Sequence, residues 1–100
     1  MHERTFQSFV ELVMQQAKEK GFGTSLPEID VAEKFVLIHS EVTEAFIAYK
    51  KGNMDGDNGL QEELGDIIQR VFHLAGCMNI NLEEALLKKI EKNKDRVWTS

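Results

Sequence analysis

The stretch VAEKFVLIHSEVTEAFIAYKK, residues 31–51, carries the clearest structural pattern in this sequence. Its large apolar residues recur at intervals of three and four, which is the period of one face of an α-helix. The stripe consists of Val31, Phe35, Ile38, Val42, Phe46 and Tyr49. Asp30 precedes the stretch as a good N-cap with Glu33 three residues later, and Gly52 follows it. A long amphipathic helix is therefore predicted here.

Three further segments have the same helical period, and polar or glycine-containing joints separate them. They are residues 5–20, 60–77 and 81–96. No segment alternates apolar and polar residues over a length that would predict a strand. One hundred residues suit one domain, so residues 1–100 are predicted to form a single all-α domain. Short joints between four helices favour an antiparallel four-helix bundle.

The composition narrows the possible functions. A formal net charge of -5 argues against a nucleic-acid-binding surface, so no nucleic-acid partner is expected. No apolar segment has the length of a membrane span, and no secretory signal pattern follows Met1, so a cytoplasmic location is expected. A chain this short buries only a modest fraction of its surface, and aromatic residues such as Phe6 and Phe9 suggest a subunit interface.

Four carboxylates have a spacing that predicts a metal site. Glu41 and Glu44 are three residues apart in one predicted helix, and Glu63 and Asp66 repeat that spacing in the next. Residues three apart lie on the same side of a helix, and a short joint would bring the two pairs face to face. Partly buried carboxylates repel one another unless a cation neutralises them, and Mg²⁺ prefers oxygen ligands. The alternative is that these acids lie on ordinary solvated helix faces.

Three motifs follow one another along the sequence. The first is HSEVTEA at residues 39–45, and the second is EELGDI at residues 62–67. The third is NLEEAL at residues 81–86, followed by a K-x-x-x-N-x-x-R pattern formed by Lys89, Asn93 and Arg96. Together they resemble the MazG-like all-α nucleoside triphosphate pyrophosphohydrolases, whose ExxE and ExxD motifs match the first two. The likeness covers residues 31–98. It departs at Ser40, where many members have a further Glu.

The resemblance implies an enzyme that cleaves a nucleoside triphosphate between its α- and β-phosphates and releases pyrophosphate. It implies Mg²⁺ as cofactor, with Mn²⁺ as a possible substitute, and assigns the metal and the catalysis to Glu41, Glu44, Glu63 and Asp66. Nothing in the sequence distinguishes these four acids as the general base, although Glu41 is our preferred candidate. Family members commonly form dimers or tetramers whose sites combine residues of neighbouring subunits.

The resemblance also implies substrate-binding residues near the C-terminal end of the sequence. Lys89 and Arg96 would hold phosphates, and Asn93 would hydrogen-bond the sugar or base. A basic helix C-terminus that complements the helix dipole is the alternative for these residues. Trp98 has two open interpretations, which are stacking on a base and packing in a core or interface. Two further functional classes stay open, namely a nucleotide- or metal-binding module without turnover and a purely structural helical bundle.

Overall fold

The computed structural model describes residues 5–96 of the chain, and this part is helical. Its elements are α1 (Phe6–Lys20), a short 3-10 helix η1 (Leu26–Glu28), α2 (Val31–Lys50), α3 (Leu60–Cys77) and α4 (Leu82–Asn93). Residues 5–96 contain no strand, which confirms the predicted all-α class. None of the described helices is long and apolar enough to cross a bilayer.

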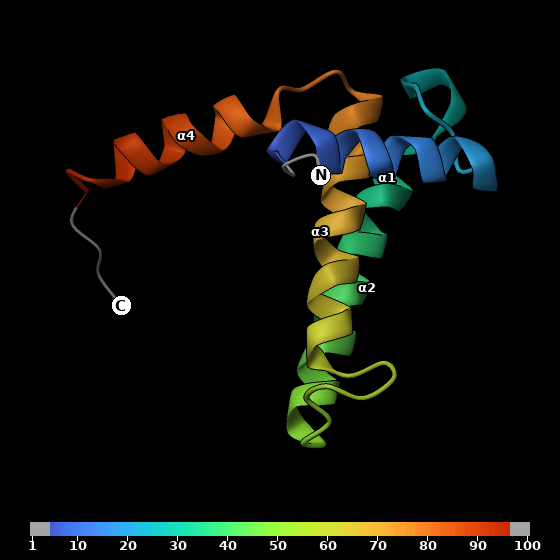
Figure 1. Ribbon diagram of the computed structural model, residues 1–100, viewed down its shortest axis with the longest axis vertical. Helices are drawn as coiled ribbons and strands as arrows, with labels where there is room; N and C mark the ends of the chain where they lie inside the picture. The colour runs from blue at the N-terminus through green and yellow to red at the C-terminus, as the bar shows by residue number, and fades with distance from the viewer. Residues whose placement is uncertain (1–4, 97–100) are drawn as a thin grey trace.

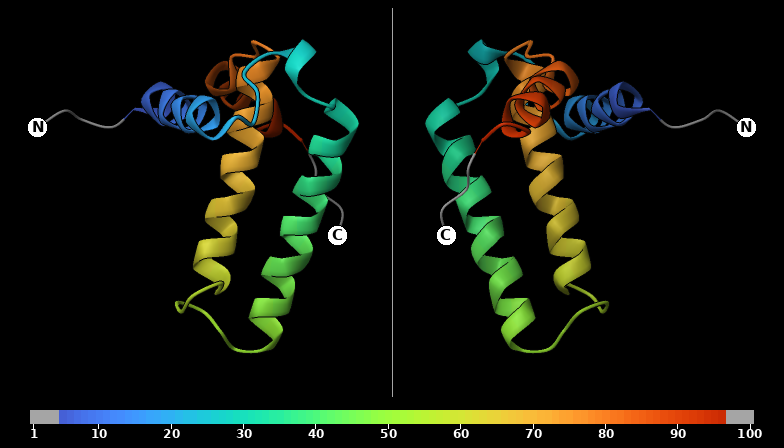
Figure 2. Two further views of the ribbon diagram at one scale, coloured as in Figure 1. Left: turned by 90° about the vertical axis from the view of Figure 1, so that its right-hand side faces the viewer. Right: turned by 90° about the vertical axis from the view of Figure 1, so that its left-hand side faces the viewer.

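Helices α2 and α3 form a hairpin that carries the predicted acidic motifs. They run side by side in opposite directions (Figure 2). The connecting loop is organised by Asn53, whose carbonyl oxygen accepts the Leu60 N–H at 2.9 Å. The Asn53 side chain also accepts the Gly56 N–H at 3.2 Å and donates to the Asp57 carbonyl at 3.1 Å. These bonds fix where α3 begins and thereby set its register against α2.

Helix α1 lies across α3 at the end of the hairpin far from this loop (Figure 1). The Phe6 and Phe72 rings meet there, with their centroids 5.0 Å apart. Gly76 leaves room for the Met14 side chain, because a Cβ atom at position 76 would overlap it. The crossing therefore places the start of the α1–α2 connection against α3.

Helix α4 points away from the hairpin (Figure 1). Its apolar residues Leu86, Leu87 and Ile90 are about half exposed or more, at 47%, 61% and 51%. The described part of one chain therefore does not close the predicted four-helix bundle, since α4 packs against none of the other helices extensively. Within residues 5–96, the apolar side of α4 is left largely uncovered.

The face that α2 turns towards α3 is not the face that the sequence pattern indicated. Its buried residues are Glu41, Ala45 and Ala48. The predicted stripe points outward instead, since Phe35, Val42 and Phe46 are 52%, 50% and 59% exposed. Small residues let two helices approach closely, so α2 uses its alanines against α3 and leaves its large apolar residues uncovered. The helix was predicted correctly, and its buried face was predicted wrongly.

The connection between α1 and α2 is fastened to α3 through one carbonyl group. The Gly23 carbonyl oxygen accepts the His73 Nε2–H at 2.8 Å and lies 3.7 Å from the Cys77 Sγ donor. Gly23 has φ +91°, a backbone conformation that residues with a side chain rarely adopt. A Cβ atom there would also approach the Glu28 carbonyl oxygen to 2.9 Å. The turn therefore requires glycine at position 23.

We expect Gly23→Ala to destabilise the protein more than Gly21→Ala does. Both glycines have positive φ, but a Cβ atom at Gly21 (φ +74°) meets no atom within 4 Å. Gly21→Ala should cost about 1 kcal/mol of strain, and Gly23→Ala should cost about 1–3 kcal/mol more through steric overlap. Urea unfolding of both variants measures the difference. Equal losses of unfolding free energy in the two variants would show that the turn can adjust to a Cβ atom at position 23.

Candidate metal centre

Three carboxylates from the two helices of the hairpin lie close together. Glu41 and Glu44 come from α2, and Glu63 comes from the first turn of α3. One carboxylate oxygen of each lies within 4.8 Å of those of the other two. Among the described residues, this is the group of His, Cys, Asp and Glu side chains whose spacing suits a metal ion. We call Glu41, Glu44 and Glu63 the acidic trio.

Two members of the trio are buried with an unsatisfied oxygen. Glu41 is 8% exposed and Glu63 is 6% exposed. The Oε2 atom of each is buried and has no hydrogen-bond partner among the described residues. A buried carboxylate oxygen without a partner is costly, because it has lost water and gained nothing in exchange. A hard cation coordinated by these oxygens would remove that cost, so the donor set fits Mg²⁺ or a similar ion.

The raised pKa of Glu63 also indicates that its negative charge lacks a compensating cation. Burial is the largest cause that raises the pKa of Glu63, from 4.5 to about 7. The adjacent Glu41 carboxyl raises the pKa next, followed by the negative charges of Glu44, Glu41 and Asp66. Without a cation, Glu63 therefore keeps its proton at pH values below about 7.

The metal-free protein should lose stability as the pH rises from about 5 to about 8. The folded state holds the Glu63 proton more tightly than the unfolded chain does, so this stabilisation is fully present below the unfolded pKa near 4.5. It is lost as the pH rises through the folded pKa of about 7. Thermal melts in a chelator should show this fall, and saturating Mg²⁺ should reduce it by stabilising the ionised carboxyl. A melting temperature that rises over this range without metal would contradict the expectation.

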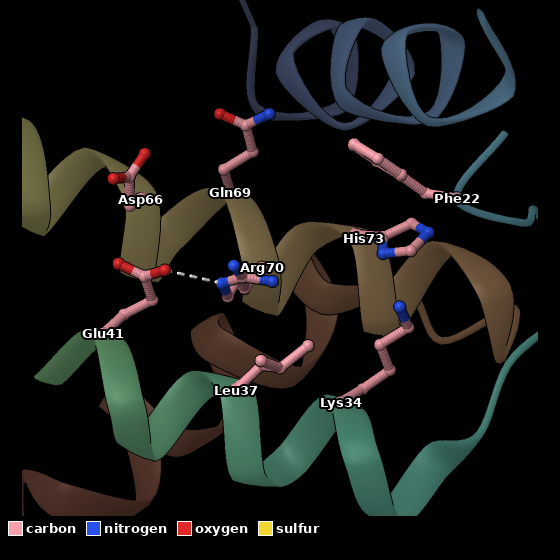
Figure 3. Close-up of a pocket in the computed structure, with 8 residues that line it drawn as sticks. All are labelled: Phe22, Lys34, Leu37, Glu41, Asp66, Gln69, Arg70 and His73. Carbon is pink, nitrogen blue, oxygen red and sulfur yellow. Dashed lines mark hydrogen bonds and ion pairs between the residues drawn. The ribbon is translucent and has the colours of Figure 1, made fainter. Parts of the chain in front are cut away.

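Asp66, the fourth predicted acid, lies beside the trio and outside it. It is exposed on α3 three residues beyond Glu63. Together with Glu41 it borders a cavity of about 330 Å³ (Figure 3). The described structure therefore brings three of the four predicted acids together and places the fourth at the rim.

Arg70 was missed by the sequence analysis and contacts the trio directly. Its Nε–H donates to Glu41 Oε1 at 2.9 Å, across the two helices of the hairpin. A signal existed in the sequence, because Arg70 is four residues beyond Asp66 and so lies on the same side of α3. The sequence pattern indicated a metal ion as the cation for these acids, and this spacing alone did not indicate that Arg70 pairs with Glu41.

The cavity next to the trio combines cationic, aromatic and apolar groups. Its lining consists of Phe22, Lys34, Leu37, Glu41, Asp66, Gln69, Arg70 and His73 (Figure 3). The Lys34 and Arg70 side chains both face this space, with the Phe22 ring on its far side. Neither Lys34 nor Phe22 was predicted. Phe22 lies in the α1–α2 connection and Lys34 in the first turn of α2, and no local sequence motif there indicates a binding residue. Cations suit phosphate, and the ring and Leu37 suit a flat apolar group.

The predicted substrate-binding residues are distant from the trio within one chain. Lys89 and Asn93 lie on α4, which points away from the hairpin, and Arg96 follows its end (Figure 1). Lys89 is exposed, whereas the Oδ1 atom of Asn93 is buried without a hydrogen-bond partner among the described residues. Trp98 lies outside the described residues. One chain therefore does not bring this set to its own acids.

The fold and the site define an all-α protein with a carboxylate-rich candidate metal centre between two antiparallel helices. The family model described as the MazG nucleotide pyrophosphohydrolase domain matches residues 33–98. This match spans α2, α3 and α4, and the chain therefore belongs to the MazG nucleotide pyrophosphohydrolase family. Comparisons with curated proteins and with solved structures gave no significant match. The family membership indicates nucleotide pyrophosphohydrolase activity in general.

Proposed function

We propose that this chain is a Mg²⁺-dependent nucleoside triphosphate pyrophosphohydrolase. It cleaves a ribo- or deoxyribonucleoside triphosphate between the α- and β-phosphates, giving a monophosphate and pyrophosphate, and Mn²⁺ can replace Mg²⁺. The observation that carries the proposal is the pair of Glu41 and Glu63 Oε2 atoms beside Glu44, which are buried and have no hydrogen-bond partner within residues 5–96. The proposal includes a cytoplasmic location. It also includes no nucleic-acid partner, which the net charge of -5 supports.

Each acid has a proposed role in this reaction. Glu41, Glu44 and Glu63 hold the cation, and Asp66 completes the ligand set from the cavity rim. The bound cation supplies charge neutralisation at the phosphates and acidifies the attacking water. A carboxylate of this set accepts the proton of that water. The cavity beside these acids receives the nucleotide, with Lys34 near its phosphates.

The residues of the C-terminal motif enter the proposal through a second subunit. Lys89 and Arg96 bind phosphates, Asn93 hydrogen-bonds the sugar or base, and Trp98, which lies outside the described residues, stacks on the base. Because α4 carries Lys89 and Asn93 away from its own hairpin, these two residues serve the site of a neighbouring chain in a dimer or tetramer. The uncovered apolar residues of α2 and α4 support such an assembly.

A nucleotide panel with Mg²⁺ tests the proposed activity. We expect pyrophosphate release that requires Mg²⁺ and that falls by about a hundredfold or more in Glu44→Ala and Asp66→Ala, because metal-bound charge contributes several kcal/mol. Glu62→Ala is the matched control, since Glu62 is an exposed acid beside Glu63 that points about 100° away around α3. Release that survives both substitutions would contradict the proposal. Metal-dependent binding without release would indicate the alternative, a nucleotide- or metal-binding module.

A further inference from the structure

Arg70 lies where the acidic trio and the adjacent cavity meet. It is on α3, and its side chain reaches across the hairpin to Glu41 (Figure 3). The Glu41 side chain in this ion pair is 11% exposed, whereas the Arg70 side chain is 38% exposed. The pair therefore has a buried acidic end and an open basic end. No role in the proposed reaction has yet been given to this arginine.

The two carboxylate oxygens of Glu41 differ in their contacts. Oε1 accepts the Arg70 Nε–H at 2.9 Å, while Oε2 is buried without a partner among residues 5–96. A metal ligand of this kind needs one free oxygen on a carboxylate that a neighbouring group holds in place. The contact with Arg70 leaves that oxygen free and fixes the carboxylate that carries it.

Arg70 does not itself neutralise the trio. Within the described residues its recorded ion pair is with Glu41, and the buried Oε2 atom of Glu63 remains without a partner. An arginine that substituted for the metal would have to satisfy both buried oxygens. The geometry is that of a support for a metal ligand.

The rest of the Arg70 guanidinium is available to the cavity. An arginine has N–H donors on three nitrogens, and only the Nε donor has a hydrogen-bond partner among the described residues. Lys34 borders the same cavity of about 330 Å³. The planar guanidinium matches a phosphate group in two parallel hydrogen bonds. A phosphate held there would lie next to Glu41.

We propose that Arg70 links the metal centre to the nucleotide, holding Glu41 with its Nε–H and binding a phosphate group with its terminal nitrogens. This inference rests on the proposed function for the identity of the phosphate ligand. Towards Glu41, Arg70 is a positioning residue. Towards the nucleotide, it is a substrate-binding residue that was absent from the predicted set.

The test measures metal and phosphate binding separately. Mn²⁺ titration without nucleotide, followed by electron paramagnetic resonance, should show affinity about tenfold or more weaker in Arg70→Gln, as for other lost supports of metal ligands. At saturating Mn²⁺, the KM for nucleotide should also rise about tenfold or more, as expected for a lost charged hydrogen bond. The matched control is Lys88→Gln, which removes the cation of an exposed ion pair with Glu84. It should change neither measurement.

The outcomes separate this inference from the proposed function. Unchanged or tighter Mn²⁺ binding in Arg70→Gln, or an unchanged KM, overturns it. Arg70→Lys keeps the charge without the planar guanidinium and should stay impaired in both measurements, so equality with the natural protein also overturns the inference. If the natural protein cleaves no nucleotide, the proposed function fails, but Arg70 is still tested by Mn²⁺ titration and by Mn²⁺-dependent binding of inorganic triphosphate.

Discussion

Glu63→Gln is expected to remove metal-dependent activity and, at the same time, to stabilise the metal-free protein. Glutamine has nearly the shape of a protonated glutamate, so it keeps the packing of Glu63 while removing its charge. That charge lies beside Glu41 and Glu44, and the raised pKa of about 7 means that ionisation of Glu63 is unfavourable in this site. Above that pH, the melting temperature of the variant should exceed that of the natural protein in a chelator.

The activity of the same variant should fall by about a hundredfold or more, since a bound metal contributes several kcal/mol to the transition state. A neutral amide also weakens the cation site, so added Mg²⁺ should raise the melting temperature of Glu63→Gln much less than that of the natural protein. Glu62→Gln is the control, because it removes an exposed charge one residue away. It should leave both the activity and the Mg²⁺ effect in place.

A variant that lost both activity and metal-free stability would indicate that Glu63 has a structural role in the fold. A variant that gained stability but kept its Mg²⁺ response would place the cation elsewhere. The expected combination, in which a loss of function accompanies a gain of stability, is typical of a site whose charges are held together for a ligand.

Local sequence patterns predicted the features that depend on neighbouring residues in one helix. The spacing of Glu41 and Glu44 identified part of the trio, and the predicted span 60–77 coincides with α3. Local patterns did not predict the buried face of α2. That helix has two apolar faces, and close packing against α3 uses Ala45 and Ala48 in place of the larger stripe.

The features that were missed depend on contacts between distant segments. The Gly23 carbonyl meets His73 across 50 residues of sequence, and this contact helps to place Phe22 at the cavity. The Arg70–Glu41 ion pair requires the register of α3 against α2, which the Asn53 loop determines. The direction of α4 was missed as well, because its apolar residues find no extensive contact with another helix among residues 5–96.

Phe46→Asp is expected to dissociate the assembled protein. Phe46 belongs to the outward apolar stripe of α2 and is 59% exposed in one chain. Aromatic residues that are buried in an interface often contribute about 2 kcal/mol or more, which corresponds to roughly thirtyfold weaker association. The introduced carboxylate adds a desolvation cost. Light scattering at micromolar concentration should report a dimer or tetramer for the natural protein and smaller species for the variant.

Val36→Asp is the matched control for this change. It introduces the same charge on the same helix at a residue that is 64% exposed, but Val36 lies about 80° around α2 from Phe46. It should leave the assembly intact. A natural protein that is monomeric, or a Phe46→Asp variant that stays assembled, would contradict the predicted interface.

Assembly also has a consequence for catalysis that mixing experiments can reveal. Lys89→Ala should raise the KM for nucleotide, and Glu44→Ala should remove turnover. If α4 serves the site of a neighbouring chain, a mixed oligomer of these two variants contains some sites with an intact Glu44 from one chain and an intact Lys89 from the other. At a nucleotide concentration well below the KM of Lys89→Ala, the refolded mixture should therefore be more active than the two variants measured separately. No recovery in a mixture shown to contain mixed oligomers would mean that α4 does not supply Lys89 to a neighbouring site.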